Sequence, residues 1–222
     1  ANIGVEKYIK EMLPIYEDLS TKIIMNIAGT DISEYVEILE LMESHSSNIT
    51  GYEINISCPN VKKGGMEFGV DCDMTSKLTE ELRKITDRLL IMKLSPNVSD
   101  IVSIGKACQD AGADAVSAIN TVVGMSIDAK SGKSNIFTTY GGLSGPAIKP
   151  IGLAAVNKLY NSLSIPIIGM GGIVSSSDVA EYILAGSTSV QVGTANFRNP
   201  GTGEDLIDMI NTYVGESNWK SL

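Results

Sequence analysis

The sequence predicts an α/β protein with a parallel sheet and helices outside it. Short, almost continuous apolar segments alternate with stretches of helical periodicity, which is typical of strands buried on both faces. No linker or large composition shift divides the 222 residues, so we expect a single domain over residues 1–222. Six βα units can be counted. A doubly wound sheet can hold six strands and a (β/α)₈ barrel needs eight, so both architectures are open at this level.

Apolar runs define the strands and a period of 3.6 residues defines the helices. We expect strands at residues 22–28, 52–56, 89–94, 115–119, 165–169 and 189–192. We expect helices after Asp31, over residues 75–88, after Ser99, from Pro146, over residues 177–186 and over residues 203–214. Ser177 or Asp178 is the expected cap of the fifth helix, and residues 121–145 read as a long loop. Gly169-Met170-Gly171-Gly172 lacks the spacing of the dinucleotide-binding fingerprint.

Composition excludes several classes of function. The net charge of −9 disfavours a nucleic acid or an anionic membrane as partner. The one histidine, His45, lies in a polar segment and is expected at the surface, so no metal site is predicted. The three cysteines form no CxxC motif, and a reducing cytoplasm suits them. The longest uncharged apolar run, residues 165–174, is half of the roughly 20 residues that span a bilayer.

Polar side chains follow or interrupt several predicted strands, where a barrel would carry its active site. Asn55, Asn60 and Asn120 offer paired donors and acceptors that suit a planar amide ligand, although each could also be a turn former. Asn26 lies inside the first strand, where a structural amide is the alternative. Glycines at 169, 171, 172 and 193 follow the last two strands and predict a phosphate site, unless they only make tight turns.

Lys93 and Cys58 are the candidate reactive side chains. Lys93 interrupts an apolar strand and could face an anionic cofactor, form a Schiff base, or extend out to solvent. Cys58 precedes a glycine-rich loop and could be a nucleophile, a general base or an inert thiol. Cys108 lies on the apolar face of a helix and is expected to be structural. Cys72 lies between acidic residues and is expected to be inert.

At these positions the chain resembles the dihydroorotate dehydrogenases. Six stretches match the family in order along nearly the whole chain. They are residues 55–60 (NISCPN), 93–97 (KLSPN), 119–121 (INT), 141–150 (GGLSGPAIKP), 169–173 (GMGGI) and 192–196 (VGTAN). The resemblance implies a (β/α)₈ TIM barrel that binds FMN and oxidises dihydroorotate to orotate in pyrimidine biosynthesis. The family has two βα units ahead of the first residue here, so the barrel is expected to be N-terminally incomplete.

The resemblance also implies roles for individual residues. Cys58 would be the catalytic base, and a cysteine at this position is typical of the cytosolic class 1 enzymes. The substrate would contact Asn55, Asn60, Asn120 and Thr121. FMN would contact Asn26, Asn55, Lys93, Asn120, Ser144, Gly145, Met170, Gly171, Gly172, Gly193 and Thr194.

The segments at 61–69 and 141–146 look most like class 1B, whose catalytic subunit pairs with a subunit carrying FAD and an iron–sulfur cluster. The resemblance therefore implies such a partner, NAD rather than fumarate as the expected electron acceptor, and a homodimer in the cytoplasm. Three other interpretations are open. They are an FMN domain of the dihydropyrimidine dehydrogenase type, an inactive truncated barrel, and a flavin-free lyase with Lys93 as its Schiff base.

Overall fold

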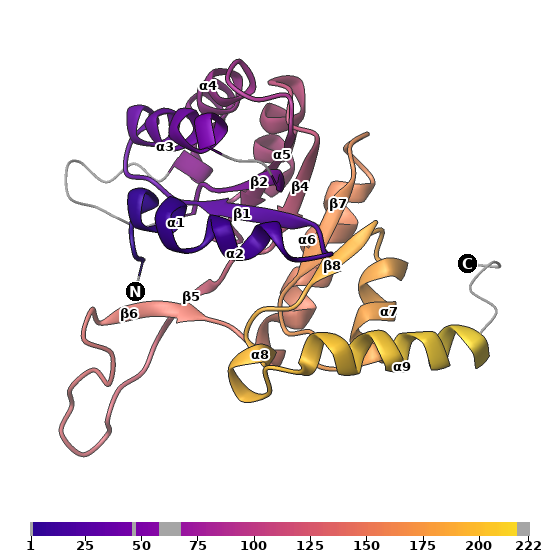
Figure 1. Cartoon of the computed structure of the whole chain (residues 1–222). Coiled ribbons are helices and arrows are strands. Elements are labelled where there is room, and N and C mark those ends of the chain that lie inside the picture. The colour runs from indigo at the N-terminus through magenta and orange to yellow at the C-terminus, as the bar shows by residue number, and fades with distance from the viewer. Residues whose placement is uncertain (1, 46–47, 58–67, 217–222) are drawn as a thin grey trace. The chain divides into compact units, whose positions relative to one another are not determined.

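The computed structural model describes residues 2–45, 48–57 and 68–216, which form two compact units (Figure 1). Unit 1 comprises residues 1–94 and 103–116, and unit 2 comprises residues 95–102 and 117–222. Strand β4 (Ala115–Ala118) contributes residues to both units. The single domain expected from the sequence stays a prediction.

Unit 1 is built on parallel strands that follow the order of the chain. Strands β1 (Ile23–Ile27), β2 (Ile49–Asn55) and β3 (Leu89–Leu94) pair in parallel, and β4 comes next in the strand order. The backbone N–H of Asp114, just ahead of β4, donates to the carbonyl of Leu90 at 2.9 Å. Strands β2 and β3 are buried at most positions, which explains their nearly continuous apolar sequence.

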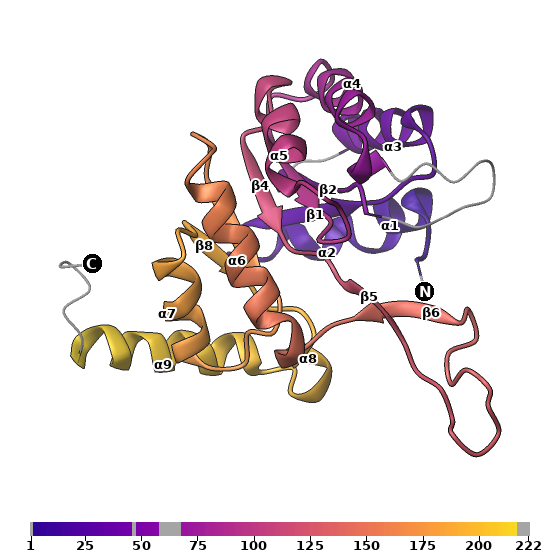
Figure 2. The same ribbon diagram turned by 180° about the vertical axis from the view of Figure 1, so that it is seen from behind.

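Helices cover the strands of unit 1. They are α1 (Val5–Glu11), α2 (Leu13–Glu17), α3 (Ile32–His45), the short η1 (Phe68–Val70), α4 (Cys72–Arg83) and α5 (Ile101–Asp110), whose first two residues belong to unit 2. Helix α3 buries Tyr35, Leu39 and Met42, which lie on one face at helical spacing. Helices α3 and α4 pack side by side in both views (Figures 1 and 2).

Unit 2 continues the alternation of strands and helices. Strands β7 (Ile167–Met170) and β8 (Ser189–Gln191) pair in parallel, while β5 (Val122–Met125) and β6 (Tyr140–Leu143) form an antiparallel hairpin. The short η2 (Pro146–Ile148) leads into α6 (Lys149–Tyr160). Helices α7 (Ser176–Leu184), α8 (Ala195–Arg198) and α9 (Thr202–Glu216) follow. Helix α6 packs on β7 and α7 packs on α9.

The structure confirms most of the predicted elements. The strand predicted at residues 89–94 has the bounds of β3, and Gly112 and Gly186 follow the ends of α5 and α7. His45 is exposed and Cys108 is buried, as expected, and this burial raises the pKa of the Cys108 thiol to about 12.

Three local predictions are wrong. The segment expected to be a loop contains the hairpin of β5 and β6, whose exposed faces leave no clear apolar alternation to detect. Helix α7 is capped by Ser175, one residue before the helix, instead of by Ser177 or Asp178. Near the start of α5, the backbone N–H of Val102 donates to Asp100 at 3.0 Å rather than to Ser99.

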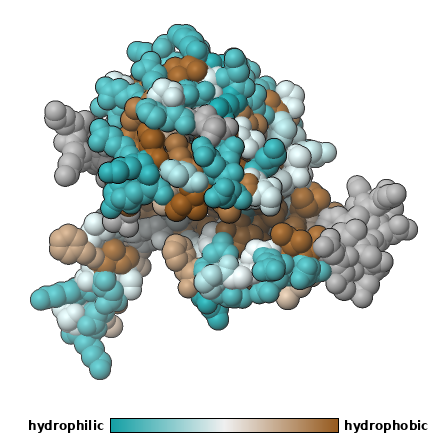
Figure 3. Space-filling model, in the orientation of Figure 1, coloured by the Kyte–Doolittle hydropathy of each residue, from teal (hydrophilic) through white to brown (hydrophobic). Residues whose placement is uncertain are grey.

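The hairpin carries exposed apolar side chains. Val123 is 59% exposed and Met125 is 48% exposed, and hydrophobic residues are visible along this arm in Figure 3, with polar residues gathered at its tip. Within the described ranges, no helix has both the length and the apolar character that a membrane crossing requires.

Candidate functional site

In unit 1, one face of the sheet carries four polar side chains. Asn26 lies opposite Glu53 in the register of β1 and β2, and Asn55 lies opposite Lys93 in the register of β2 and β3. Glu53 and Asn55 are two residues apart, so both pairs project from the same face. Three of these four residues were expected from the sequence, whereas Glu53 was missed.

Glu53 connects two of the expected residues. Its carboxylate accepts a hydrogen bond from the Asn26 amide at 2.6 Å and forms an ion pair with the Lys93 ammonium at 3.2 Å. The Glu53 side chain is only 5% exposed and that of Lys93 is 17% exposed. A carboxylate this deeply buried requires such partners. We call Asn26, Glu53 and Lys93 the Glu53 cluster, in which Lys93 is paired rather than extended into solvent.

The end of β2 is held by hydrogen bonds around Asn55. The Tyr35 hydroxyl donates to the Asn55 carbonyl at 2.7 Å, and the Ser57 N–H donates to the Asn55 side chain at 3.2 Å. The Ser57 hydroxyl in turn donates to the Lys93 carbonyl at 3.4 Å. These contacts fix the chain just before residue 58. Cys58 and Asn60 themselves lie outside the described residues.

In unit 2, Asn120 and Thr121 lead into the hairpin. The Thr121 N–H donates to the Asn120 side chain at 2.8 Å, and the Thr121 carbonyl accepts from the Asn97 amide at 3.0 Å. The Asn97 side chain also accepts from the Val123 N–H at 2.9 Å. Asn97 therefore positions this segment. In the sequence, the only indication of such a role was its position after the strand predicted at residues 89–94.

The predicted phosphate-binding residues of unit 2 come together. Gly145, Gly171 and Gly172 have φ values of 86°, 120° and 75°, a region that side chains with a Cβ rarely adopt. A Cβ on Gly172 would lie 2.8 Å from the Gly145 carbonyl oxygen, and one on Gly145 would lie 3.9 Å from the Thr194 methyl group. A Cβ on Gly193 would meet no atom within 4 Å. We call Gly145, Gly171, Gly172, Gly193 and Thr194 the glycine cradle.

The glycine cradle has the chemistry of an anion site. Positive φ values and close backbone approach bring N–H groups near a ligand without interference from side chains. The space beside Gly193 is open on the protein side, and Thr194 adds a hydroxyl. Ser144 precedes the cradle and Met170 precedes Gly171 in the chain. These residues therefore have the chemistry to fit a phosphate group, and the phosphate site stays a prediction.

A cavity of 940 Å³ in unit 1 is a separate feature. It is lined by residues of α1, β1 and α3, including Asn26. Three glutamates, Glu6, Glu34 and Glu37, also line it. Their negative charge disfavours a phosphate there, so the glycine cradle is the better candidate for an anionic group.

Comparison with known proteins adds independent information. The model of the family described as dihydroorotate dehydrogenase matches residues 1–214. A protein of Malacoplasma penetrans called dihydroorotate dehydrogenase B (NAD(+)), catalytic subunit, is 45% identical over 217 residues, which are 98% of this chain and 71% of that protein. A protein of the same name from Alkaliphilus metalliredigens is 45% identical over 221 residues, which are 100% of this chain and 72% of that protein.

Among solved structures, the dihydroorotate dehydrogenase of Eimeria tenella in complex with ferulenol matches with a TM-score of 0.74. The match has 20% sequence identity and covers 96% of this chain and 64% of that chain. At this identity the likeness shows the fold, and it confirms the (β/α)₈ barrel class with six of the strands present. The chain spans less than two thirds of that solved protein.

Proposed function

Because the chain belongs to the dihydroorotate dehydrogenase family, we propose that it oxidises dihydroorotate to orotate, with FMN as its bound cofactor, in pyrimidine biosynthesis. The observation that carries the cofactor proposal is the glycine cradle, where positive φ values and an open space beside Gly193 suit the FMN phosphate. The family match over residues 1–214 supports the choice of substrate.

The proposed reaction removes a proton and a hydride from neighbouring carbons. Cys58, as its thiolate, takes the proton from C5 of dihydroorotate, and the electron pair of that bond forms the C5–C6 double bond of orotate. FMN, when bound, supplies the acceptor for the hydride that leaves C6. The amides of Asn55, Asn60 and Asn120, with Thr121, hold the planar substrate by hydrogen bonds to its ring.

The Glu53 cluster supports the proposed flavin contacts of Lys93 and Asn26, because it holds both side chains in defined positions. Lys93 would bring a positive charge to the flavin ring, where negative charge accumulates on reduction. Its ion pair with Glu53 at 3.2 Å holds the ammonium on the face that also carries Asn55. Asn26 is held by the same carboxylate. Ser144, Met170 and the glycine cradle would contact the remainder of FMN.

We also propose partners for the complete enzyme. The relatives are named catalytic subunits of an NAD(+)-dependent enzyme. By this likeness the electrons would pass to NAD through a second subunit that holds FAD and an iron–sulfur cluster, and the catalytic chain would form a homodimer in the cytoplasm. Purification of the chain together with such a subunit, and NAD reduction by the pair, tests this part.

The decisive test is the reductive half-reaction, which needs no partner subunit. Under anaerobic conditions, dihydroorotate is expected to bleach the flavin absorption of the FMN-loaded chain, while dihydrouracil is not. Bleaching by dihydrouracil alone would assign the chain to the dihydropyrimidine dehydrogenase type. If FMN fails to bind, or neither compound bleaches it, the proposal is wrong.

Substitution of the proposed base gives a further prediction. Cys58→Ala is expected to keep FMN and to slow its reduction at neutral pH by about a hundredfold or more, because no group remains to take the C5 proton. Stopped-flow absorbance measures this rate. Cys72→Ala is the matched control and is expected to react like the unchanged chain. Equal rates in the Cys58→Ala variant and the unchanged chain would remove Cys58 from the mechanism.

A further inference from the structure

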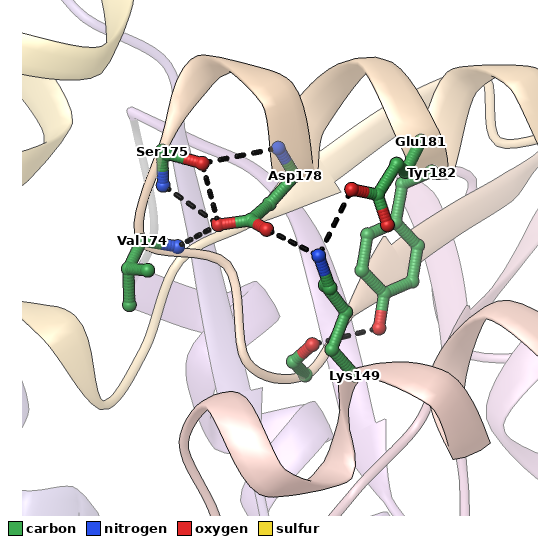
Figure 4. A network of polar contacts seen from close by, with 7 residues as sticks. Lys149, Val174, Ser175, Asp178, Glu181 and Tyr182 are labelled. Atoms are coloured by element: carbon green, nitrogen blue, oxygen red, sulfur yellow. Dashed lines mark hydrogen bonds and ion pairs between the residues drawn. The ribbon is translucent and has the colours of Figure 1, made fainter.

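A network of charged and polar side chains, shown in Figure 4, contacts the segments that carry Gly171 and Gly172 of the glycine cradle. The Lys149 ammonium donates to the carboxylates of Asp178 at 2.6 Å and Glu181 at 2.9 Å. These two hydrogen bonds raise the pKa of Lys149, so the ammonium stays charged. Because two carboxylates already neutralise it, Lys149 is not available as the counter-ion of a bound phosphate.

Asp178 joins this ion pair to the loop that carries Gly171 and Gly172. Its second carboxylate oxygen accepts from the backbone N–H groups of Val174 at 2.9 Å and Ser175 at 2.8 Å, and from the Ser175 hydroxyl at 2.8 Å. Asp178 is only 6% exposed. Burial alone raises the pKa of this carboxyl. The hydrogen bonds from Lys149, Val174 and Ser175 outweigh this effect and lower the pKa below its ordinary value, so the carboxylate is ionised.

Lys149 also lies next to Gly172 of the cradle. A Cβ on Gly172 would lie 3.0 Å from the Lys149 Cβ and 3.1 Å from the Lys149 nitrogen. Lys149 begins α6, directly after the η2 turn that follows Gly145. The Lys149–Asp178 pair therefore ties together the two segments that supply Gly145 and Gly172.

Tyr182 controls the orientation of the cradle peptides. Its side chain is fully buried, and its hydroxyl lies within donating distance of the carbonyls of Met170 at 3.1 Å and Gly171 at 2.7 Å. In a trans peptide the C=O and the following N–H point in opposite directions. Carbonyls that face Tyr182 therefore turn the N–H groups of Gly171 and Gly172 away from it.

The Tyr182 side chain fits only because two neighbouring positions are glycine. A Cβ on Gly152 would overlap the Tyr182 hydroxyl, and a Cβ on Gly169 would lie 2.5 Å from the Tyr182 ring. Gly152 belongs to α6 and Gly169 to β7. The ring is thus seated between a helix and a strand, which restricts its movement and holds the hydroxyl under the loop.

We propose that Lys149, Asp178 and Tyr182 are positioning residues that preset the glycine cradle for a phosphate monoester. They act through the backbone, and none of them contacts the phosphate. This inference rests on the proposed function, because the phosphate it concerns is that of FMN. Its consequence is selectivity, since a preset cradle favours FMN over riboflavin, which lacks the phosphate, whereas a network that only supports the fold would affect both flavins alike.

The test compares FMN with riboflavin by titration of flavin fluorescence on the full chain. Tyr182→Phe keeps the ring and removes the hydroxyl, and it is expected to lower the ratio of FMN affinity to riboflavin affinity by about tenfold. Asp178→Asn is expected to lower the same ratio by at least about fivefold. Glu181→Gln is the matched control, because it removes the more exposed partner of Lys149 and leaves Asp178 in place; its ratio is expected to stay unchanged.

Each outcome has a defined meaning. Equal losses of FMN and riboflavin affinity, or an unchanged ratio in both variants, would overturn the inference and leave the proposed function standing. An unchanged chain that binds FMN no better than riboflavin would overturn both. Circular dichroism and the thermal midpoint identify a variant that does not fold. If Tyr182→Phe is such a variant, Asp178→Asn measured against Glu181→Gln decides the question.

Discussion

Glu53 has a carboxylate that is almost completely buried between an amide and an ammonium group. A carboxylate can stay charged in the interior only while its partners remain, because the low dielectric there makes an unpaired charge energetically costly. The same contact holds Lys93 on the face of the sheet that carries Asn55. A single acidic residue thus supports both the stability of unit 1 and the proposed flavin contacts.

Removal of one charge from this pair should be more harmful than removal of both. Glu53→Leu is expected to lower the free energy of unfolding by about 3 kcal/mol, because it leaves the largely buried Lys93 ammonium, 17% exposed, without its counter-ion. The double variant Glu53→Leu with Lys93→Met is expected to recover most of this loss. Urea denaturation measures both values, and equal losses in the single and double variants would show that the two charges are not coupled.

At the scale of elements, the β7–α7 connection combines a strained loop with a well-capped helix. The loop needs glycine at residues 171 and 172. The helix is closed by reciprocal hydrogen bonds between Ser175 and Asp178, which form a capping box. The cap anchors the end of the loop, so the strained glycine conformations are maintained by hydrogen bonds a few residues away.

Replacement by alanine should have different effects on stability at two glycines of the cradle. Gly172→Ala is expected to cost about 2 kcal/mol of stability, because φ is positive and the new Cβ would press on the Gly145 carbonyl oxygen. Gly193→Ala is expected to leave stability unchanged, since its Cβ meets no protein atom. The same methyl group should weaken FMN binding, because it fills space assigned to the phosphate. Unchanged FMN affinity in Gly193→Ala would place the phosphate elsewhere.

The cap of α7 should make stability depend on pH in a defined direction. The pKa of Asp178 is lowered in the folded chain, so its stabilising contribution is present above the unfolded pKa of about 3.9 and is lost as the pH falls through the lower folded value. The difference in unfolding free energy between the unchanged chain and Asp178→Asn is therefore expected to have its largest value at about pH 5–8. It is expected to decrease below about pH 4. Urea denaturation across this range measures it, and a constant difference would contradict the assignment.

At the scale of the whole molecule, an acidic chain is proposed to bind two anions, FMN and dihydroorotate. The net charge of −9 cannot attract them. Local groups must do so, and the backbone N–H groups of the glycine cradle are the proposed ones for the phosphate. Binding of an anion by an acidic protein thus depends on how backbone dipoles are arranged rather than on total charge.

Binding of FMN should stabilise the chain by mass action. At a free FMN concentration one hundred times its Kd, the free energy of unfolding is expected to rise by about 2.7 kcal/mol. Thermal unfolding followed by circular dichroism measures the shift of the midpoint. Riboflavin at the same concentration is the control and is expected to give a smaller shift. Equal shifts would argue against a phosphate site.

Structural features that a local pattern of residues marks were predicted from the sequence, and features without such a pattern were not. The strand at residues 89–94 was predicted with its observed bounds, because an apolar run bounded by polar residues is a local feature. The hairpin of β5 and β6 was missed, since each of its strands has only 4 residues, contains glycine and is partly exposed. The α7 cap was misplaced because Ser175, Ser176 and Ser177 are chemically alike and only the backbone distinguishes them.

The sequence by itself determined the fold class, the family motifs and the glycines of the cradle, because these depend on residue types at short spacings. Only the tertiary structure decided which groups meet. Glu53 contacts residues 27 and 40 positions away in the chain, and Lys149 reaches Asp178 across 29 positions. Such pairs follow from strand register and helix packing, which bring distant residues together with no local pattern to mark them.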